Sequence, residues 1–239
     1  MGSDLTRRGF LAVAGTGVAA GATTYWPPAE GAERASRARP LKIVGVCCSL
    51  RKGRSTVAAM QVCLDAAKAV DPENIETELI DLAEMKIPAS PAAGVDLEPG
   101  AADDFPALAP KLSNPNVAGI IVGTPVYFGN MSSLCKAFLE RCMAFRKSDF
   151  ALSNKVAGVL AVGGARNGGQ ELTIKSVQTA LLCQNMIIVG EAKPSCHGGA
   201  AVWNNGEKFL NDELNQATAT SLGRRVAEVA RRVAGVAAP

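Results

Sequence analysis

The sequence predicts an α/β protein with a doubly wound, five-stranded parallel sheet and helices on both faces of that sheet. From residue 41 onward, short apolar runs rich in branched side chains alternate with longer stretches of helical character. Two of the runs, 116–125 and 155–164, are almost continuously apolar, which is typical of strands buried on both faces. Such an alternation favours parallel strands joined by right-handed crossovers.

Five runs are expected to form strands and four stretches to form helices, in this order along the chain. The expected strands are 41–47, 75–82, 116–125, 155–164 and 186–190. The expected helices are 55–70, 132–145, 169–184 and 210–233, the last with Leu222, Val226, Val229 and Val233 on one face. Residues 83–106 interrupt this rhythm, since they form a long stretch rich in Pro, Ala and Gly. They are either a functional loop or an insert without regular structure.

The first forty residues are expected to form a signal and linker, separate from a domain at 41–239. Thr6-Arg7-Arg8-Gly9-Phe10-Leu11, followed by a weakly apolar stretch, resembles a twin-arginine export signal. Export would place the protein in the periplasm or another extracytoplasmic compartment. The alternative is a chance Arg-Arg pair before a moderately apolar tail. No apolar run is long enough to predict a membrane span.

The charge argues against a nucleic-acid-binding protein, and the cysteines argue against a metal site. The formal net charge is +3, and five arginines and three acids fall in residues 1–40, so the remainder is close to neutral. A nucleic-acid-binding protein would carry a basic surplus, and none is expected here. The seven cysteines include no Cys-x-x-Cys pair, and most lie in apolar segments, where cysteine behaves as a small hydrophobic residue. No metal site is therefore expected.

The turn after the first strand has the composition of an anion-binding loop. Residues 49–56 combine three hydroxyl and three basic side chains at the start of a helix, whose first turn has free N–H groups. The loop lacks both G-x-x-x-x-G-K-[ST] and G-x-G-x-x-G, so neither a nucleoside triphosphate nor a dinucleotide is expected on it. A monophosphate would fit. The alternative is a solvated basic turn in which Ser55 caps the helix.

Two more loops follow expected strands at the same edge of the sheet, where ligands of doubly wound sheets bind. Together the segments CSLRKGRST, TPVYFGNMSSLCKAFLER and GGARNGGQE resemble the flavin-binding loops of NADPH-dependent FMN reductases and iron–sulfur flavoproteins, within the flavodoxin-like superfamily. The resemblance extends from residue 41 to the terminal LGRRVAEVARRV. It implies a flavodoxin-like sheet of strand order 2-1-3-4-5 and FMN as cofactor.

The resemblance also implies which residues bind FMN. The phosphate would be held by Ser49, Arg51, Lys52, Ser55 and Thr56. The ring would be lined by Pro125, Val126, Tyr127, Phe128, Gly129 and Asn130, and approached at its other edge by Gly163, Gly164, Arg166 and Gly169. Tyr127 and Phe128 could instead complete the core, and Arg166 could be a surface residue. If Arg166 is not a surface residue, it is the candidate for a positive charge near the pyrimidine edge of the flavin.

One departure from the iron–sulfur flavoproteins is clear. Their cysteine cluster lies after the second strand, whereas EMKIPASPAAGVDLEPG contains no cysteine, so no iron–sulfur centre is expected. The single histidine, His197, could approach the flavin or a substrate, although a supporting or surface role is favoured.

The expected function is electron transfer from NAD(P)H or another donor through FMN to a small acceptor such as a quinone or flavin. No catalytic side chain is expected, because the flavin itself carries the chemistry. Two alternatives are an FMN-binding electron carrier without its own small-molecule substrate and a flavin-free binding protein. The resemblance also implies a homodimer or homotetramer.

Overall fold

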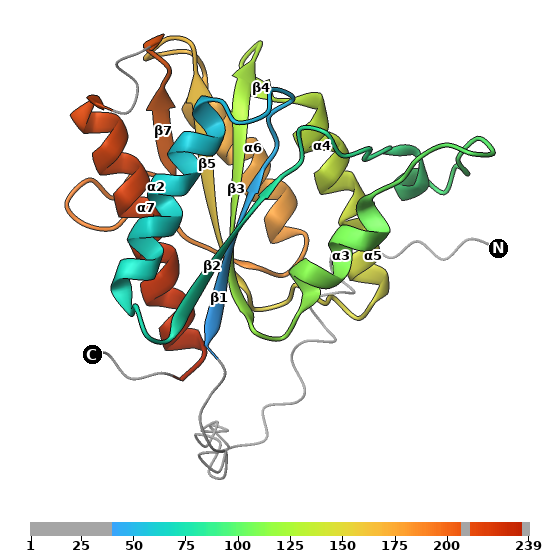
Figure 1. Cartoon of the computed structure of the whole chain (residues 1–239), viewed down its shortest axis with the longest axis horizontal. Helices are drawn as coiled ribbons and strands as arrows, with labels where there is room; N and C mark the ends of the chain where they lie inside the picture. Colours follow the sequence, from blue (N-terminus) through green and yellow to red (C-terminus); the bar gives the residue numbers. More distant parts are fainter. Residues whose placement is uncertain (1–39, 207–210, 236–239) are drawn as a thin grey trace, which may run out of the picture. The chain divides into compact units, whose positions relative to one another are not determined.

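The computed structural model of the chain describes residues 40–206 and 211–235 (Figure 1). Residues 1–39, which carry the predicted export signal, lie outside this range, so the signal and the domain boundary remain predictions. Within the described residues, no helix combines the length and the apolar character needed to cross a membrane.

The central sheet has the parallel strand order β2-β1-β3-β5-β6, which confirms the predicted order. These strands are β1 Leu41–Cys47, β2 Ile75–Asp81, β3 Val117–Tyr127, β5 Val156–Gly163 and β6 Ile187–Ile188. Every residue of β5 is buried, as expected for a strand covered on both faces. Two further strands extend the sheet to seven: β4 Asn130–Met131, antiparallel to β3, and β7 Ala200–Trp203, parallel to β5.

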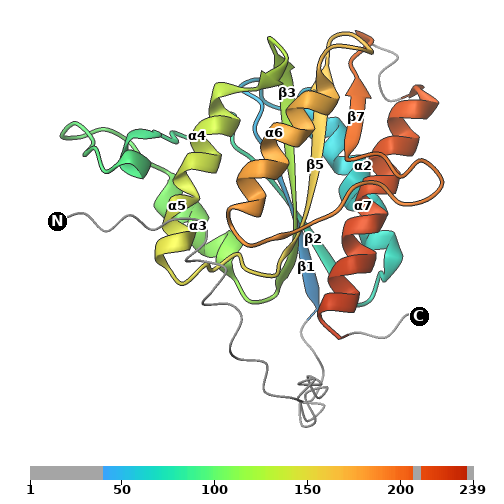
Figure 2. The ribbon, with the colours of Figure 1, turned by 180° about the vertical axis from the view of Figure 1, so that it is seen from behind.

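Helices cover both faces of the sheet and divide the core into two clusters. The α2 helix Ser55–Val70 and the α7 helix Glu213–Val233 pack on one face, against residues such as Ile43 and Leu160. The other face is covered by α3 Phe105–Ser113, α4 Ser133–Arg141, α5 Met143–Lys147 and α6 Gln170–Leu182. Figures 1 and 2 show these two layers from the front and from behind.

The contact between α2 and α7 depends on small residues. A Cβ at Gly223 would lie 1.9 Å from the Cys63 carbonyl oxygen, so the two helices approach as closely as a glycine allows. Leu222 and Val226 are buried, as predicted, but Val233 is 48% exposed. Ala227 and Ala230 are buried instead of Val233, because the close contact between α2 and α7 favours small side chains over large ones.

Three elements differ from the sequence-based expectation. The expected strand at 186–190 pairs with β5 only at Ile187–Ile188; the chain then leaves the sheet at 189–199 and returns as β7. The expected helix at 132–145 is divided at Cys142 into α4 and α5. The unpredicted α3 contains Pro106 and Pro110, residues that oppose a helical assignment, although Pro106 is tolerated in its first turn.

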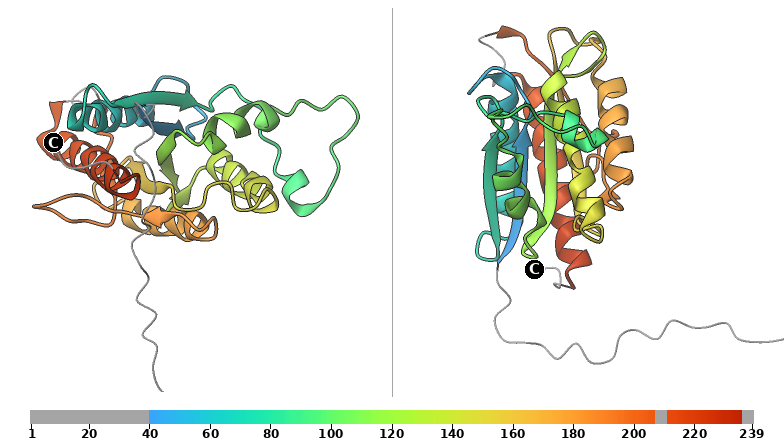
Figure 3. Two further views of the ribbon diagram at one scale, coloured as in Figure 1. Left: turned by 90° about the horizontal axis from the view of Figure 1, so that it is seen from below. Right: turned by 90° about the vertical axis from the view of Figure 1, so that its right-hand side faces the viewer.

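The segment between β2 and α3 projects away from the sheet and helices (Figure 3). It contains one short 3₁₀ helix, η1 Ser90–Ala93. Its base is closed by two bonds between Lys86 and Asp104: Asp104 N donates to Lys86 O at 2.8 Å, and Lys86 N donates to the Asp104 carboxylate at 2.7 Å.

Candidate cofactor site

Three turns meet at the carboxyl edge of the sheet: the first loop (48–54, after β1), the hairpin (126–131, β3 to β4) and the third loop (164–169, after β5). Cys48 N donates to Gly123 O at 2.7 Å, which joins the first loop to β3. A Cβ at Gly169 would lie only 2.9 Å from Gly129 Cα, so the third loop touches the hairpin through glycine backbone. The predicted site residues are therefore brought to one place.

The first loop leads into an uncapped helix N-terminus. Arg54 is the N-cap residue of α2 and makes no capping bond with its side chain, and no acidic residue occupies the first turn. The first N–H groups of α2 are therefore available to an anion, which the helix dipole also favours. Thr56 lies in this turn and is 2% exposed. Ser49 is equally buried, and its Oγ accepts a hydrogen bond from Arg51 N at 3.1 Å, which shapes the turn.

The basic side chains of the first loop are not equivalent. Lys52 forms an ion pair with Glu84, and this hydrogen bond raises the pKa of Lys52. Arg51 and Arg54 have no carboxylate partner among the described residues. Both arginines are exposed and free to pair with an incoming anion.

Ser132 joins the first loop to the hairpin, and it is a site residue that the sequence analysis missed. Its Oγ donates to Cys48 O at 2.6 Å and accepts from Cys135 N at 3.1 Å, so it also caps α4. Its backbone N donates to Thr124 Oγ1 at 3.1 Å. A serine immediately before a helix is the sequence signal for such a cap.

The hairpin is a tight two-residue turn with an unusual residue at its tip. Tyr127 pairs with Asn130, and the residues between them, Phe128 and Gly129, have φ values of 51° and 74°. Positive φ at both positions is the type I′ geometry, which favours Asn or Gly over Phe. Phe128 is fully exposed and Tyr127 is 40% exposed, which rules out the alternative that they complete the core.

The third loop is shaped by Gln170, whose side chain is buried. Gln170 Oε1 accepts from Gly168 N at 2.8 Å, and its Nε2 donates to Ala165 O at 2.6 Å. A Cβ at Gly163 would lie 2.4 Å from Gln170 Nε2, so any larger residue there would displace the Gln170 amide. Gly164 has nothing within 4 Å of its Cβ position, so its backbone is open to close approach by a ligand.

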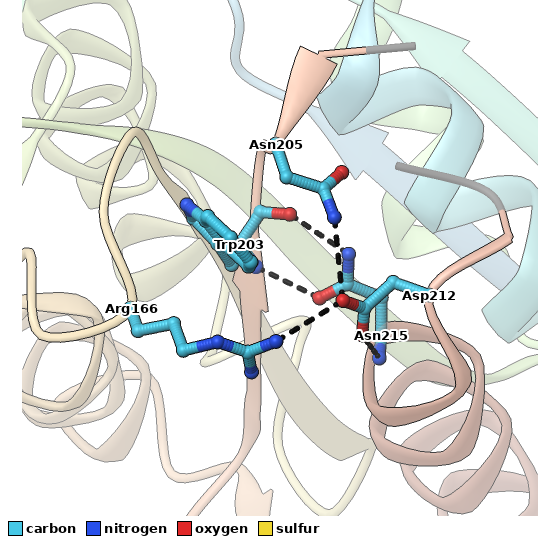
Figure 4. A network of polar contacts seen from close by, with 5 residues as sticks. All are labelled: Arg166, Trp203, Asn205, Asp212 and Asn215. Atoms are coloured by element: carbon cyan, nitrogen blue, oxygen red, sulfur yellow. Dashed lines mark hydrogen bonds and ion pairs between the residues drawn. The ribbon is translucent and has the colours of Figure 1, made fainter. Parts of the chain in front are cut away.

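Arg166 is engaged by residues from beyond the third loop (Figure 4). Its guanidinium lies 4.4 Å over the Trp203 ring and pairs with Asp212 at 3.2 Å, while its side chain stays 52% exposed. Asp212 caps α7 by accepting from Asn215 N, and the Asn215 side-chain amide bonds to both N and O of Trp203. The charge of Arg166 is therefore partly neutralised, and a role at the flavin edge requires it to leave this network or share it.

The remaining predicted residues lie on or beside these turns. Pro125 is buried near the end of β3, Val126 is partly buried, and the Asn130 side chain accepts from Met131 N at 2.8 Å. Ser55 starts α2. The uncapped helix end, the unpaired arginines and the close glycine contacts together fit a planar ligand with a terminal phosphate, and so fit FMN.

No group of three His, Cys, Asp or Glu side chains stands ready to hold a metal in the part of the chain that the structure describes. His197 is 70% exposed and faces Glu191, in the segment between β6 and β7.

Comparison with known proteins identifies the family. A model of the NADPH-dependent FMN reductases matches residues 41–200. An iron–sulfur flavoprotein of Methanocaldococcus jannaschii is 36% identical over 199 residues, which cover 81% of this chain and 99% of the relative. An NAD(P)H dehydrogenase (quinone) of Acidithiobacillus ferrooxidans is 33% identical over 133 residues, which cover 50% of this chain and 66% of the relative.

The same fold occurs in the crystal structure of a flavodoxin, WrbA-like protein from Agrobacterium tumefaciens. It is 21% identical, has a TM-score of 0.55, and is matched over 80% of this chain and 98% of its own. The chain therefore belongs to the NADPH-dependent FMN reductase family of flavodoxin-like oxidoreductases, and FMN is its cofactor.

Proposed function

We propose that the protein takes electrons from NAD(P)H and passes them to a small acceptor such as a quinone or free flavin. Two facts support this proposal: the family is described as NADPH-dependent, and one relative is named an NAD(P)H dehydrogenase (quinone). FMN, when bound, supplies the redox chemistry, since it can accept a hydride and return electrons.

The residues of this chain would hold the cofactor at both its phosphate and its ring. The N–H groups at the start of α2, with the hydroxyls of Ser55 and Thr56 and the charge of Arg51, would bind the phosphate. The hairpin and the glycines of the third loop would line the ring. The single observation that carries the proposal is the match of residues 41–200 to the NADPH-dependent FMN reductases, and the backbone contact between Gly129 and Gly169 brings the ring-lining loops together.

Anaerobic stopped-flow mixing of the FMN-loaded full-length chain with NADPH or NADH tests this proposal. We expect the visible absorbance of the flavin to bleach within seconds and to return when a soluble quinone is added. If the flavin stays oxidised for minutes with both nucleotides, yet dithionite reduces it, direct reduction by a nicotinamide is excluded.

That second result would favour an FMN-binding electron carrier without its own small-molecule substrate. One observation supports this alternative: Phe128 is fully exposed at the hairpin tip, in a conformation unfavourable for its residue type. An exposed aromatic next to the cofactor suits contact with a protein partner.

We also propose export by the twin-arginine route, supported by the pattern at 6–11 in the undescribed segment. Replacing both Arg7 and Arg8 by Lys should retain the protein in the cytoplasm; equal periplasmic amounts of both versions would contradict export by this route.

We further propose a homodimer or homotetramer, as the family resemblance implies. Sedimentation of the FMN-loaded protein as a monomer at micromolar concentration would refute it.

A further inference from the structure

The edge of the sheet opens into a cavity where the fifth strand is interrupted. Residues 189–199 leave the sheet between β6 and β7, so β7 forms the edge beside β5. The crossing at the base of this excursion is tight, because a Cβ at Gly190 would lie 2.2 Å from His197 O. Between α6, β7 and α7 the structure has a cavity of about 510 Å³, a size typical of small-molecule sites.

The cavity adjoins the third loop of the predicted flavin site, through Arg166 and Asn167, but most of it lies outside that site. Among the residues predicted to bind FMN, only Arg166 lines it. Much of its wall is apolar, with Ile174 from α6, Ala201 from β7 and Leu214 from α7. Leu214 is 64% exposed, which is unusual for a leucine unless something covers it.

A buried carboxylate organises the polar end of this cavity. The Glu191 side chain is 1% exposed and accepts hydrogen bonds from Ser195 Oγ and Thr218 Oγ1. His197 Nδ1 lies 3.3 Å from Glu191 Oε2. A carboxylate this deeply buried needs such partners, and all three of them line the same cavity.

Glu191 fixes the orientation of His197. Because Nδ1 faces the carboxylate, the proton of the neutral imidazole is expected on Nδ1, and Nε2 is left as a hydrogen-bond acceptor. The imidazole is 70% exposed and lines the cavity, so Nε2 can meet a ligand that donates an O–H group. This pairing of histidine and carboxylate is the usual means of holding a proton-accepting imidazole in place.

A positively charged side chain, that of Lys175, lies near this imidazole. The position of a Cβ at Gly198 lies 3.2 Å from Lys175 Nζ, so the ammonium sits next to the residue that follows His197. Lys175 has no carboxylate partner among the described residues. The other charged groups of the cavity are Arg166, which pairs with Asp212, and Glu171 and Glu191.

We propose that this cavity binds a small phenolic compound, whose ring packs on Leu214 and Ile174 and whose hydroxyl donates to His197 Nε2. When the phenol is acidic, as a nitrophenol is, the proton moves to Nε2: the phenol O–H bond breaks, an N–H bond forms, and the phenolate charge faces Lys175 while Glu191 stabilises the imidazolium. No electron is transferred in this step. A carboxylic acid fits less well, because it enters already ionised and offers Nε2 no proton.

Binding of 4-nitrophenol to the FMN-loaded full-length chain tests this inference, because its phenolate absorbs visible light and its phenol form does not. Near neutral pH, where free 4-nitrophenol is a mixture of phenol and phenolate, difference spectra should show a saturable increase in the phenolate band. His197 is the only histidine in the chain, so its ring signals in ¹⁵N-edited NMR report the site without ambiguity. These signals should shift with 4-nitrophenol and stay unchanged with 4-nitroanisole, which lacks the hydroxyl.

Variants supply the matched comparison. We expect His197→Gln and Lys175→Gln to weaken 4-nitrophenol binding about tenfold or more, as the loss of a charge-assisted hydrogen bond implies. Lys147→Gln, an exposed lysine at the end of α5, should leave it unchanged. Thermal melting establishes that each variant is folded; if His197→Gln does not fold, Lys175→Gln and NMR of the parent protein decide.

Two results would overturn the inference. Unmoved His197 signals at saturating 4-nitrophenol would show that the ligand does not reach this cavity. Binding that the apoprotein shows and FMN abolishes would place 4-nitrophenol in the flavin site instead. Neither result would affect the proposed reductase activity, which is measured with NAD(P)H.

Discussion

At the scale of single residues, the site depends on two glycines whose backbones meet. Gly169 has a φ of 95° and a Cβ position 2.9 Å from Gly129 Cα. A side chain at position 169 would therefore combine an unfavourable backbone conformation with contact against backbone, which cannot rotate away. The spacing between the hairpin and the third loop is set by these two residues.

Gly169→Ala is expected to lower stability and FMN affinity together. The left-handed conformation costs about 1–2 kcal/mol for a residue with a Cβ, and displacement of the hairpin adds to it. FMN binding, followed by quenching of flavin fluorescence, should weaken about tenfold or more, as a shift of 1.4 kcal/mol implies. Urea denaturation of the apoprotein measures the change in stability.

Gly164→Ala is the matched control in the same loop. Nothing lies within 4 Å of its Cβ position, so the apoprotein should keep its stability to within about 0.5 kcal/mol. If the flavin passes close to this backbone, the substitution weakens FMN binding alone. Equal losses of apoprotein stability for both variants would contradict the argument from the Gly129 contact.

Sequence reasoning predicts which loops form the site better than it predicts how their side chains are used. The three loops could be assigned to one edge because parallel strands share a direction. The partners of Arg166 could not be predicted, because Trp203 and Asp212 come from β7 and the N-cap of α7, far along the chain. The role of Ser132 as a helix cap could be predicted from the sequence. Its hydrogen bond to Cys48 could not, because only the fold brings these two residues together.

At the scale of elements, one guanidinium anchors the segment that projects between β2 and α3. Arg141, in α4, donates to both carboxylate oxygens of Asp103, at 3.0 and 2.8 Å, and to Pro88 O at 2.9 Å. It also lies 4.7 Å over the Phe105 ring at the start of α3. Both ends of the projecting segment therefore depend on α4, the helix that follows the hairpin.

Arg141→Met is expected to destabilise the protein by about 2 kcal/mol, because the mostly covered Asp103 carboxylate keeps only its hydrogen bond from Phe105 N. Lys136→Met on the same helix is the control, since its exposed pair with Glu140 contributes less than about 1 kcal/mol. Urea denaturation at neutral pH measures both. Similar small losses for the two variants would show that Arg141 does not anchor the segment.

The same pair predicts a dependence of stability on pH. Burial would raise the pKa of Asp103, but the hydrogen bonds from Arg141 and Phe105 N and the Arg141 charge outweigh it, so the pKa is lowered. A lowered pKa in the folded state stabilises above the unfolded pKa, and this contribution is lost as pH falls through the folded pKa. Asp103→Asn should therefore lose less stability on acidification than the parent protein.

Element boundaries were hardest to predict where strands are short. The β6 strand pairs through only two residues, and β7 is a four-residue segment that begins with two alanines, too short for a clear alternation. Both are held by pairing with the buried β5 rather than by their own propensity. By contrast, α2 has the predicted bounds, since a long helical stripe is a strong signal.

At the scale of the whole molecule, the two core clusters hold four of the seven cysteines. Cys48, Cys135 and Cys142 lie in the cluster beneath α4 and α6, and Cys63 lies in the cluster beneath α2 and α7. They fill space as small apolar side chains, as the sequence predicts for cysteines within apolar segments. A chain exported in the folded state would keep such thiols from the oxidising compartment.

The native protein should therefore present two reactive thiols out of seven. Cys183 and Cys196 are exposed, and the other five are buried. Burial raises the pKa of Cys47 and of Cys142 to about 12, so the reactive thiolate is scarce at neutral pH. Titration with Ellman's reagent should show two rapid equivalents in the native state and seven in guanidinium. Cys183→Ser and Cys196→Ser should each remove one rapid equivalent; a third rapid thiol in the folded parent protein would mean that one of the two cores opens to solvent far more readily than its packing implies.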